Sequence, residues 1–264
     1  MSLSRSLHDF PSVVLRLRAA GCVFAEDEAE LLLSTAGSAA ELDAMVDRRA
    51  AGLPLEHVLG WAEFCGLRVA VDPGVFVPRR RTEFLVGRAA ELAGPAPVVL
   101  DLCCGAGAVG AALAAALGGA AELHAADIDP VAVRCARRNL AAAGGTVYQG
   151  DLYAPLPEAL RGRVDVLVAN APYVPSAAIG LLPAEARDHE PLVALDGGAD
   201  GLDVQRRVIA DAPAWLAPGG HLLVETSDRQ APRTLAAFTA AGLEARTAEC
   251  EDLDATVVVG RRRP

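Results

Sequence analysis

The sequence contains no lysine and only two asparagines, Asn139 and Asn170, among its 264 residues. All 24 of its basic side chains are therefore arginines. Lysine and asparagine use AT-rich codons, whereas arginine and the abundant alanine use GC-rich ones, so the shortage indicates a GC-rich genome. An asparagine is still rare enough in this chain that we ask where each one lies.

Positive charge is also scarce, since the net charge is −10. This argues against a chain that coats nucleic acid or an anionic membrane through its overall field, although it does not exclude a local basic patch. No run of about 18 apolar residues occurs without interruption by glycine, so we expect no membrane-spanning helix. Arg5, His8 and Asp9 interrupt the first ten residues, so we expect no signal peptide and a cytoplasmic location.

The chain lacks the cysteine spacing of a metal or disulfide framework. Six cysteines occur, with no C-x-x-C pair among them. We therefore expect free thiols in a reducing compartment and no metal site. Apolar residues make up 52% of the chain, which excludes general disorder and supports a buried core.

The first part of the chain reads as helices followed by a hairpin. Up to about residue 50, apolar residues recur at helical spacing, as at Val13, Val14 and Leu17. From 54 to 78 the pattern changes to short strands, beginning at Val58–Leu59, with turns at glycines. This segment is predicted to be a hairpin that joins two domains.

From about residue 82 onward, strands and helices alternate. Strands are expected at 98–101, 121–126, 145–149, 164–169 and 221–225, and helices at 108–117, 130–142, 202–216 and 230–241. Such units with short loops predict a parallel sheet covered by helices on both faces. The last two strands, at about 243–249 and 255–260, are joined too tightly for a helical crossover and must be antiparallel.

A glycine turn follows the first of these strands. Gly105, Gly107 and Gly110 have the spacing G-x-G-x-x-G, which alone would fit a dinucleotide site. The strand, however, ends in Asp101, whose carboxylate would repel a diphosphate and could pair with an ammonium group. The start of the next helix could hold a carboxylate. S-adenosylmethionine, an amino acid attached to a nucleoside, fits both ends.

The next two strands also end in acids. Asp127 could accept hydrogen bonds from both ribose hydroxyls, and Asp151 from an adenine amino group, with Leu152 against the ring. Each acid could instead be a helix cap or a solvated turn residue. Three acids at the carboxyl ends of successive strands, where such sheets bind ligands, favour a nucleoside site.

Asn170 ends the fourth strand and begins the segment Asn-Ala-Pro-Tyr. The Asn170 side-chain oxygen and the Ala171 carbonyl could hold an NH2 group by its hydrogens. Pro172 stiffens the loop, and Tyr173 can lie against a planar substrate or a sulfonium. An Asx turn followed by proline is the alternative. The position at a strand end favours methyl transfer to nitrogen, which depends on alignment.

Several motifs together resemble the protein-(glutamine-N5) methyltransferases, the HemK-like enzymes. They are Pro54-Leu-Glu-His-Val-Leu-Gly60, Val77-Pro-Arg-Arg-Arg-Thr-Glu83, Asp101 to Gly107, Asp127 to Asn139, Val168-Ala-Asn-Ala-Pro-Tyr-Val174 and Glu190-Pro-Leu-Val-Ala-Leu-Asp-Gly-Gly198. The resemblance covers nearly all of residues 54–230. It departs from the family at Ala171, which replaces the first proline of N-P-P-Y.

The resemblance implies a class I methyltransferase with an α/β fold. Its seven-stranded, mostly parallel sheet would have an antiparallel last strand, and a small N-terminal helical domain would precede it. The expected boundaries are 1–53 for the helical domain, 54–80 for the hairpin linker and 81–264 for the methyltransferase domain. The donor would be S-adenosylmethionine, leaving S-adenosylhomocysteine. The acceptor would be a glutamine amide of a release factor or another translation protein.

The resemblance also assigns site residues. Cofactor-binding residues would be Asp101, Cys103, Gly105, Gly107, Asp127, Ile128, Asp151, Leu152 and Asn170. Catalytic residues would be Asn170, Ala171, Pro172 and Tyr173. Substrate-binding residues would be Arg79, Glu190, Pro191 and Tyr173. No metal, membrane or stable nucleic-acid binding is expected, and the chain is predicted to act as a monomer.

Other readings stay open. The chain could be an N-methyltransferase of small molecules or natural products, an adenine-N6 nucleic-acid methyltransferase, or a nucleoside-binding regulator without activity. A dehydrogenase is disfavoured by Asp101. The cluster Arg79–Arg81 could contact a phosphate or an acidic partner, or it could be a solvated turn, because cations before a helix oppose its dipole.

Overall fold

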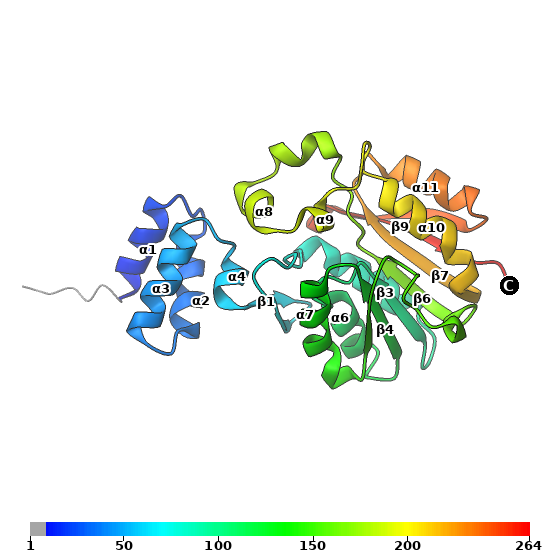
Figure 1. Cartoon of the computed structure of the whole chain (residues 1–264), viewed down its shortest axis with the longest axis horizontal. Helices are drawn as coiled ribbons and strands as arrows, with labels where there is room; N and C mark the ends of the chain where they lie inside the picture. Colours follow the sequence, from blue (N-terminus) through cyan, green and yellow to red (C-terminus); the bar gives the residue numbers. More distant parts are fainter. Residues whose placement is uncertain (1–8) are drawn as a thin grey trace, which may run out of the picture.

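The computed structural model describes residues 9–264, which begin with a bundle of three helices. These are α1 (Phe10–Ala19), α2 (Ala25–Thr35) and α3 (Ala39–Ala50). Val13, Leu17 and Leu32 are fully buried at their centre. Figure 1 shows the bundle at one end of the molecule, apart from the sheet. The helical prediction is confirmed for the described residues, and most of the segment that we expected not to be a signal peptide lies outside them.

A short helix and a hairpin join the bundle to the sheet. Helix α4 (Leu55–Leu59) is followed by strands β1 (Trp61–Phe64) and β2 (Leu67–Ala70), which pair antiparallel. The prediction of a strand at Val58–Leu59 is wrong, because these residues complete a helical turn that ends at Gly60 in the left-handed conformation (φ 81°).

Seven strands form the central sheet, in the order β5–β4–β3–β6–β7–β9–β8. Their bounds are β3 (Val98–Leu102), β4 (Glu122–Asp127), β5 (Thr146–Gln149), β6 (Val164–Ala169), β7 (Leu216–Thr226), β8 (Glu244–Cys250) and β9 (Ala255–Arg261). Within the described chain, β9 alone runs against the others. The predicted sheet is confirmed. Strand β7 starts earlier than expected, because Leu216 already pairs with Val164 of β6; the register then shifts, and regular pairing resumes at His221 opposite Val166.

Helices cover the two faces of the sheet, as predicted. One face packs against α5 (Glu83–Leu92), α6 (Ala108–Ala116) and α7 (Pro130–Leu140), and the other against α10 (Asp203–Trp215) and α11 (Ala231–Ala240). Successive side chains of β3 point to opposite faces of the sheet, so Val99 belongs to the core on the first face and Leu100 to the core on the second. Both cores are apolar and hold the strand ends in fixed positions.

A long excursion separates β6 from α10. It contains the 3-10 helix η4 (Ser176–Leu181) and the short helices α8 (Ala184–His189) and α9 (Leu192–Leu195). Further 3-10 turns are η1 (Arg80–Thr82), η2 (Ala141–Ala143), η3 (Glu158–Leu160) and η5 (Glu251–Leu253). In Figure 1 the excursion arches over the edge of the sheet where β3 and β6 end. It therefore roofs the region where the sequence predicts a site.

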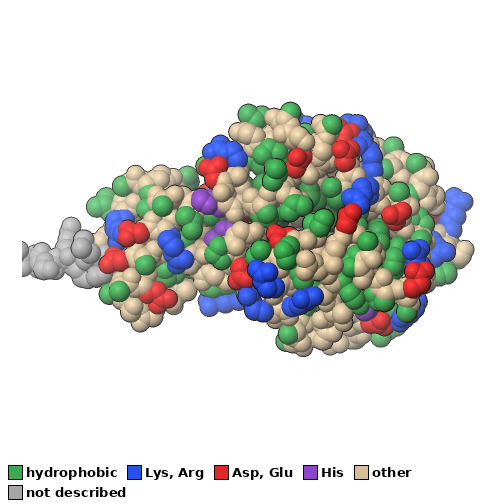
Figure 2. Space-filling view, viewed as in Figure 1, with side chains coloured by type: hydrophobic (Ala, Val, Ile, Leu, Met, Phe, Trp, Pro, Cys, Tyr) green, Lys and Arg blue, Asp and Glu red, His purple; other side chains and the backbone are tan. Residues whose placement is uncertain are grey.

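Charged side chains are mixed on the surface, and the helices are short. On the face drawn in Figure 2, arginines and acidic side chains lie interspersed between hydrophobic ones. Of the helices in residues 9–264, none is long and apolar enough to cross a membrane.

Candidate active site

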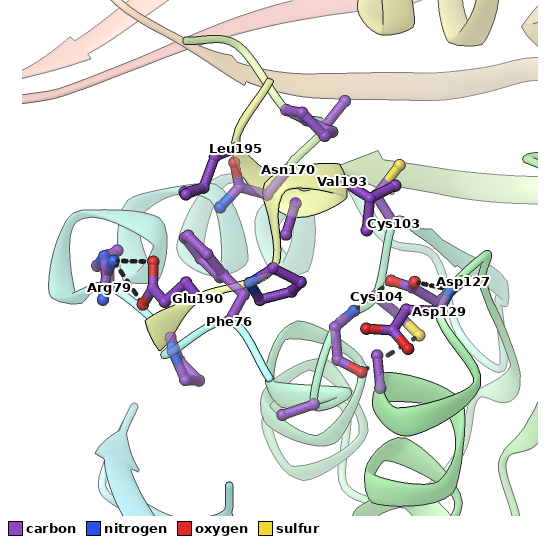
Figure 3. Close-up of a pocket in the computed structure, with 18 of the residues that line it drawn as sticks. Phe76, Arg79, Cys103, Cys104, Asp127, Asp129, Asn170, Glu190, Val193 and Leu195 are labelled. Atoms are coloured by element: carbon purple, nitrogen blue, oxygen red, sulfur yellow. Dashed lines mark hydrogen bonds and ion pairs between the residues drawn. The ribbon is translucent and has the colours of Figure 1, made fainter. Parts of the chain in front are cut away.

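A cavity of about 620 Å³ opens at the carboxyl ends of β3, β4 and β6. Most of the predicted site residues line it: Arg79, Asp101, Cys103, Gly105, Asp127, Ile128, Asp151, Leu152, Asn170, Ala171, Pro172, Tyr173, Glu190 and Pro191. Figure 3 shows Asp127 on one side, Arg79 with Glu190 on the other, and Asn170 above and between them. The structure thus brings together residues that lie far apart in the sequence.

Asp101 lies in the wall of the cavity with 2% of its surface exposed. Its Oδ2 accepts a hydrogen bond of 3.0 Å from the Gly110 amide. Burial raises the pKa of Asp101 to about 7, and the Gly110 amide opposes this rise. A buried carboxyl group without a cationic partner is costly in its charged form. An ammonium group in the cavity would supply the missing cation.

Asp127 anchors the glycine turn. Its Oδ2 accepts from the Gly105 amide at 2.8 Å and its Oδ1 from the Asp129 amide at 2.9 Å. Each carboxylate oxygen keeps a further lone pair for a ligand hydroxyl. Beside it, Ile128 is 50% exposed, an unusual exposure for a large aliphatic side chain at a cavity wall. This arrangement fits a ribose next to an apolar ring.

Two lining residues adopt the left-handed backbone conformation that side chains rarely take. They are Cys103 (φ 55°) and Leu152 (φ 47°), which follow β3 and β5. Such strain is typical of functional sites. Asp151, next to Leu152, is half exposed, and its Oδ2 pairs with Arg207 Nη2 at 2.6 Å.

Gly107 is the one predicted residue that the described cavity wall does not include. Its φ is +79°, and an added Cβ would lie 3.1 Å from Ala136 Cβ, so it allows α6 to start close to α7. Asn139 secures the same turn, because its Nδ2 donates to the carbonyls of Ala70 and Ala106 at 2.8 Å each. The first scarce asparagine therefore ties the hairpin to the glycine turn.

Asn170, the second scarce asparagine, starts the loop on the other side of the cavity. Its Nδ2 donates to Thr82 Oγ1 at 3.3 Å, while its Oδ1 accepts no hydrogen bond from any described residue. The next residue, Ala171, is 1% exposed. The Tyr173 hydroxyl donates to Glu225 Oε1 at 3.3 Å, and the Tyr173 carbonyl accepts from Gln230 Nε2 at 2.9 Å.

The arginine cluster binds carboxylates of its own chain. Arg79 Nη2 lies 2.7 and 2.6 Å from the two oxygens of Glu190, and the Val77 amide donates to the same carboxylate at 3.2 Å. Arg81 Nε lies 3.5 Å from Glu225 Oε1. From the sequence we interpreted these arginines as contacts for an external partner or as a solvated turn. Neither interpretation describes Arg79, because its partner is Glu190, 111 residues later in the same chain.

Sequence reasoning did not assign Thr82 and Glu225 to the site. Both are nearly fully buried, at 3% and 1% exposed, and both contact the Asn170 loop. The rule that ligands gather at the carboxyl ends of parallel strands could have indicated Glu225, which stands near the end of β7. Thr82 precedes a helix, where a hydroxyl usually indicates only a cap.

The chain that forms this cavity is similar to known methyltransferases in sequence and in structure. Residues 66–182 match the family model of the Methyltransferase small domain. The chain is 41% identical over 200 residues to the release factor glutamine methyltransferase of Geobacter sulfurreducens, covering 75% of this chain and 69% of that one. The corresponding protein of Mycolicibacterium smegmatis is 42% identical over 203 residues, covering 76% and 71%. A methyltransferase structure from Pyrococcus furiosus superimposes with a TM-score of 0.57 at 15% identity, covering 75% and 90%.

Proposed function

Since the chain belongs to the release factor glutamine methyltransferase family, we propose that it methylates the side-chain amide nitrogen of a glutamine in a peptide chain release factor. One observation carries the proposal. Asp101, a buried carboxyl group, and Asn170, whose Oδ1 accepts no hydrogen bond from the residues that the structure describes, line the same cavity, so a cationic methyl donor and a planar amide acceptor can meet there.

The donor side fits S-adenosylmethionine, whose sulfonium makes its methyl group electrophilic and which leaves as S-adenosylhomocysteine. Asp101 would hold the ammonium group, because among the described residues this buried carboxyl group contacts the Gly110 amide and no cation. Asp127 would accept from the ribose hydroxyls with the lone pairs that its backbone contacts leave free. Ile128 and Leu152 would pack on the adenine, and Asp151 would accept from its amino group.

The acceptor side fits a glutamine amide. Asn170 Oδ1 and the Ala171 carbonyl would accept the two hydrogens of the NH2 group and point its nitrogen at the donor. The new C–N bond forms as the S–C bond breaks, and the nitrogen loses one proton. An amide nitrogen is a weak nucleophile, so alignment must supply most of the rate. Tyr173 would pack beside both reactants.

The proposal has consequences for partners and location. We propose that the enzyme acts as a monomer in the cytoplasm, with no stable binding of nucleic acid. The negative net charge and the mixed charges on the face of Figure 2 support the last point. The small-molecule and adenine-N6 readings gain no support from the two release factor glutamine methyltransferases compared above.

A methylation assay with purified components tests the proposal. The chain is incubated with labelled S-adenosylmethionine and a bacterial release factor, and mass spectrometry locates the label. Methylation of one glutamine is expected, and changing that glutamine to glutamate should abolish the label. The Asn170→Ala variant should lose transfer but keep its affinity for the donor. Label on nucleic acid or on a small molecule from an added extract, with none on the release factor, would overturn the assignment.

A further inference from the structure

Glu225 is a buried acid near the end of β7, directly beside the Asn170 loop. Strands β6 and β7 are parallel neighbours, with Ala169 opposite Val224, so Asn170 and Glu225 follow in adjacent positions. The residue is 1% exposed, and its Oε2 has no hydrogen-bond partner among the described residues. Burying an acid in this way is costly, which calls for a reason beyond packing.

Three polar groups surround this carboxyl group. Tyr173 donates its hydroxyl to Oε1 at 3.3 Å, and Arg81 Nε lies 3.5 Å from the same oxygen. Burial raises the pKa of Glu225, whereas the hydroxyl of Thr82 is the strongest of the neighbours that lower it. Glu225 thus contacts Tyr173, at one end of the loop, and Arg81, which directly precedes the Thr82 that contacts the other end.

The hydroxyl of Thr82 is placed to link Asn170 to Glu225, since it accepts from Asn170 Nδ2 and follows Arg81, which contacts the acid. A hydroxyl has one hydrogen to donate and two lone pairs to accept with, whereas a carboxylate can only accept. With Asn170 Nδ2 as the donor to Oγ1, the Thr82 hydrogen can turn to Glu225 Oε2, which has no other partner among the described residues, and a lone pair of Oγ1 remains for Asn170. That lone pair can be met only by a donor, which is the Asn170 Nδ2 observed 3.3 Å away.

We call this arrangement, from Asn170 through Thr82 to Glu225, the relay. It distinguishes the oxygen from the nitrogen of the Asn170 side-chain amide, although the two ends are nearly equal in shape. If the Asn170 side chain rotated by half a turn, its Oδ1 would face the oxygen of Thr82 with no hydrogen between them. Its NH2 would then face the NH2 of the acceptor, and two donors cannot bond each other. The direction of the relay thus decides whether the loop can hold an amide nitrogen.

We propose that Glu225 is a positioning residue, which acts through Thr82 to hold Asn170 with its Oδ1 toward the acceptor nitrogen. The inference rests on the proposed function for the identity of the acceptor, but the orientation of Asn170 can be measured without any reaction. The same carboxylate receives the Tyr173 hydroxyl, so one acid fixes both ends of the loop from Asn170 to Tyr173.

The two asparagines of the chain make the orientation directly observable. Protein labelled with ¹⁵N-asparagine has two side-chain NH2 groups. That of Asn139 serves as an internal control, since it contacts Ala70 of the hairpin and Ala106 of the glycine turn rather than the acceptor loop. In Glu225→Gln and in Thr82→Val, the NH2 signals of Asn170 should shift and exchange faster with water, while those of Asn139 stay in place. Thr82→Ser keeps the hydroxyl and should leave both unchanged. Unchanged Asn170 signals in Thr82→Val would overturn the proposal.

A reversal of polarity tests the consequence for catalysis. In Asn170→Asp, two carboxylates compete for the single Thr82 hydrogen, and kcat should fall by about 100-fold. Adding Glu225→Gln supplies an NH2 group on the far side of Thr82, so the Thr82 hydroxyl can donate to the carboxylate introduced by Asn170→Asp, and kcat should recover about 10-fold. Donor affinity should be constant throughout. A double variant no better than Asn170→Asp alone would overturn the relay, whereas an inactive parent chain with the expected NMR shifts would overturn only the proposed function.

Discussion

The two halves of the cavity are held together in different ways. In the donor half, defined as residues 101–110 with Asp127, carboxylates accept from backbone amides 2 to 22 residues away in the chain. In the acceptor half, defined as the Asn170–Tyr173 loop with its supports, the contacts run between side chains or loops 52 to 88 residues apart. The donor half is therefore locally encoded, and the acceptor half depends on the assembled fold.

This difference suggests how specificity can vary on a common scaffold. A strand followed by a glycine turn forms a nucleoside-binding shape where the strand order of such a sheet reverses, as it does at β3 between β4 and β6. The acceptor loop instead rests on Thr82, Glu225 and Gln230, which come from three other segments. Changes far from the loop in sequence should therefore alter transfer while leaving the donor bound.

The largest expected effect comes from Gly201, which lies behind the acceptor loop. An added Cβ would be 2.3 Å from the Tyr173 carbonyl oxygen and 2.4 Å from Gln230 Nε2, and its φ of +78° also disfavours a side chain. Gly201→Ala should push Tyr173 out of place and lower kcat by about 100-fold, as small misplacements of reacting groups do. Steady-state kinetics with a release factor measures this loss.

The matched control for that substitution is Gly180→Ala. This glycine belongs to the same excursion after the loop, but an added Cβ would meet no atom within 4 Å. Its kcat should stay within about threefold of the parent, and both variants should bind the donor within about threefold of it. Equal loss of donor binding and of transfer in Gly201→Ala would break the separation of the two halves.

Asp101→Asn tests the donor half and should have the next largest effect. Removing the charge that faces the donor ammonium should weaken binding by about 30-fold, equivalent to about 2 kcal/mol. Since the pKa of Asp101 is raised to about 7, donor affinity in the parent should increase as the pH rises through this value, and the variant should lack that increase. Calorimetry across the pH range measures both.

The same shift has the opposite effect on the stability of the protein without donor. The folded state keeps the Asp101 proton up to about pH 7, whereas the unfolded chain releases it near the ordinary pKa of 3.8. Stability should therefore decrease as the pH rises between these values and then level off. The Asp101→Asn variant should lack this part of the decrease in stability, which thermal unfolding at a series of pH values measures. A variant that is less stable than the parent at pH 8 would contradict the account.

Local encoding also explains which parts of the structure could be predicted from the sequence. The sheet, its helices and the acids Asp101 and Asp127 followed from strand patterns and from the rule for strand ends. The strand at Val58–Leu59 was predicted wrongly, because two aliphatic residues cannot distinguish a strand from a single helical turn that ends at glycine.

The supports of the acceptor loop could not be derived in the same way. The partner of Arg79 is Glu190, 111 residues away, and nothing in the arginine cluster itself indicates which carboxylate it will meet. The importance of Glu225 appears only when β7 lies next to β6, and strand order is a property of the assembled sheet. Resemblance to a family identified the loop but not the groups that orient it.

The smallest effect is expected at the contact between the N-terminal bundle and the roof of the acceptor half. Arg49 of α3 is buried on Glu28, and its Nη1 also lies 2.7 Å from Glu185 Oε1 on α8, which lines the cavity. Glu185 is half exposed, so this contact is worth at most about 1 kcal/mol. Glu185→Gln should raise the KM for the release factor by about threefold and leave kcat and donor affinity unchanged, because it loosens only the roof of the cavity.

The control is Asp188→Asn, which should change nothing. Asp188 lies on the same helix, but among the described residues it pairs only with its neighbour Arg187. If both substitutions raised KM alike, the charge of α8 would matter in general, and the bundle would have no specific part in holding the acceptor half.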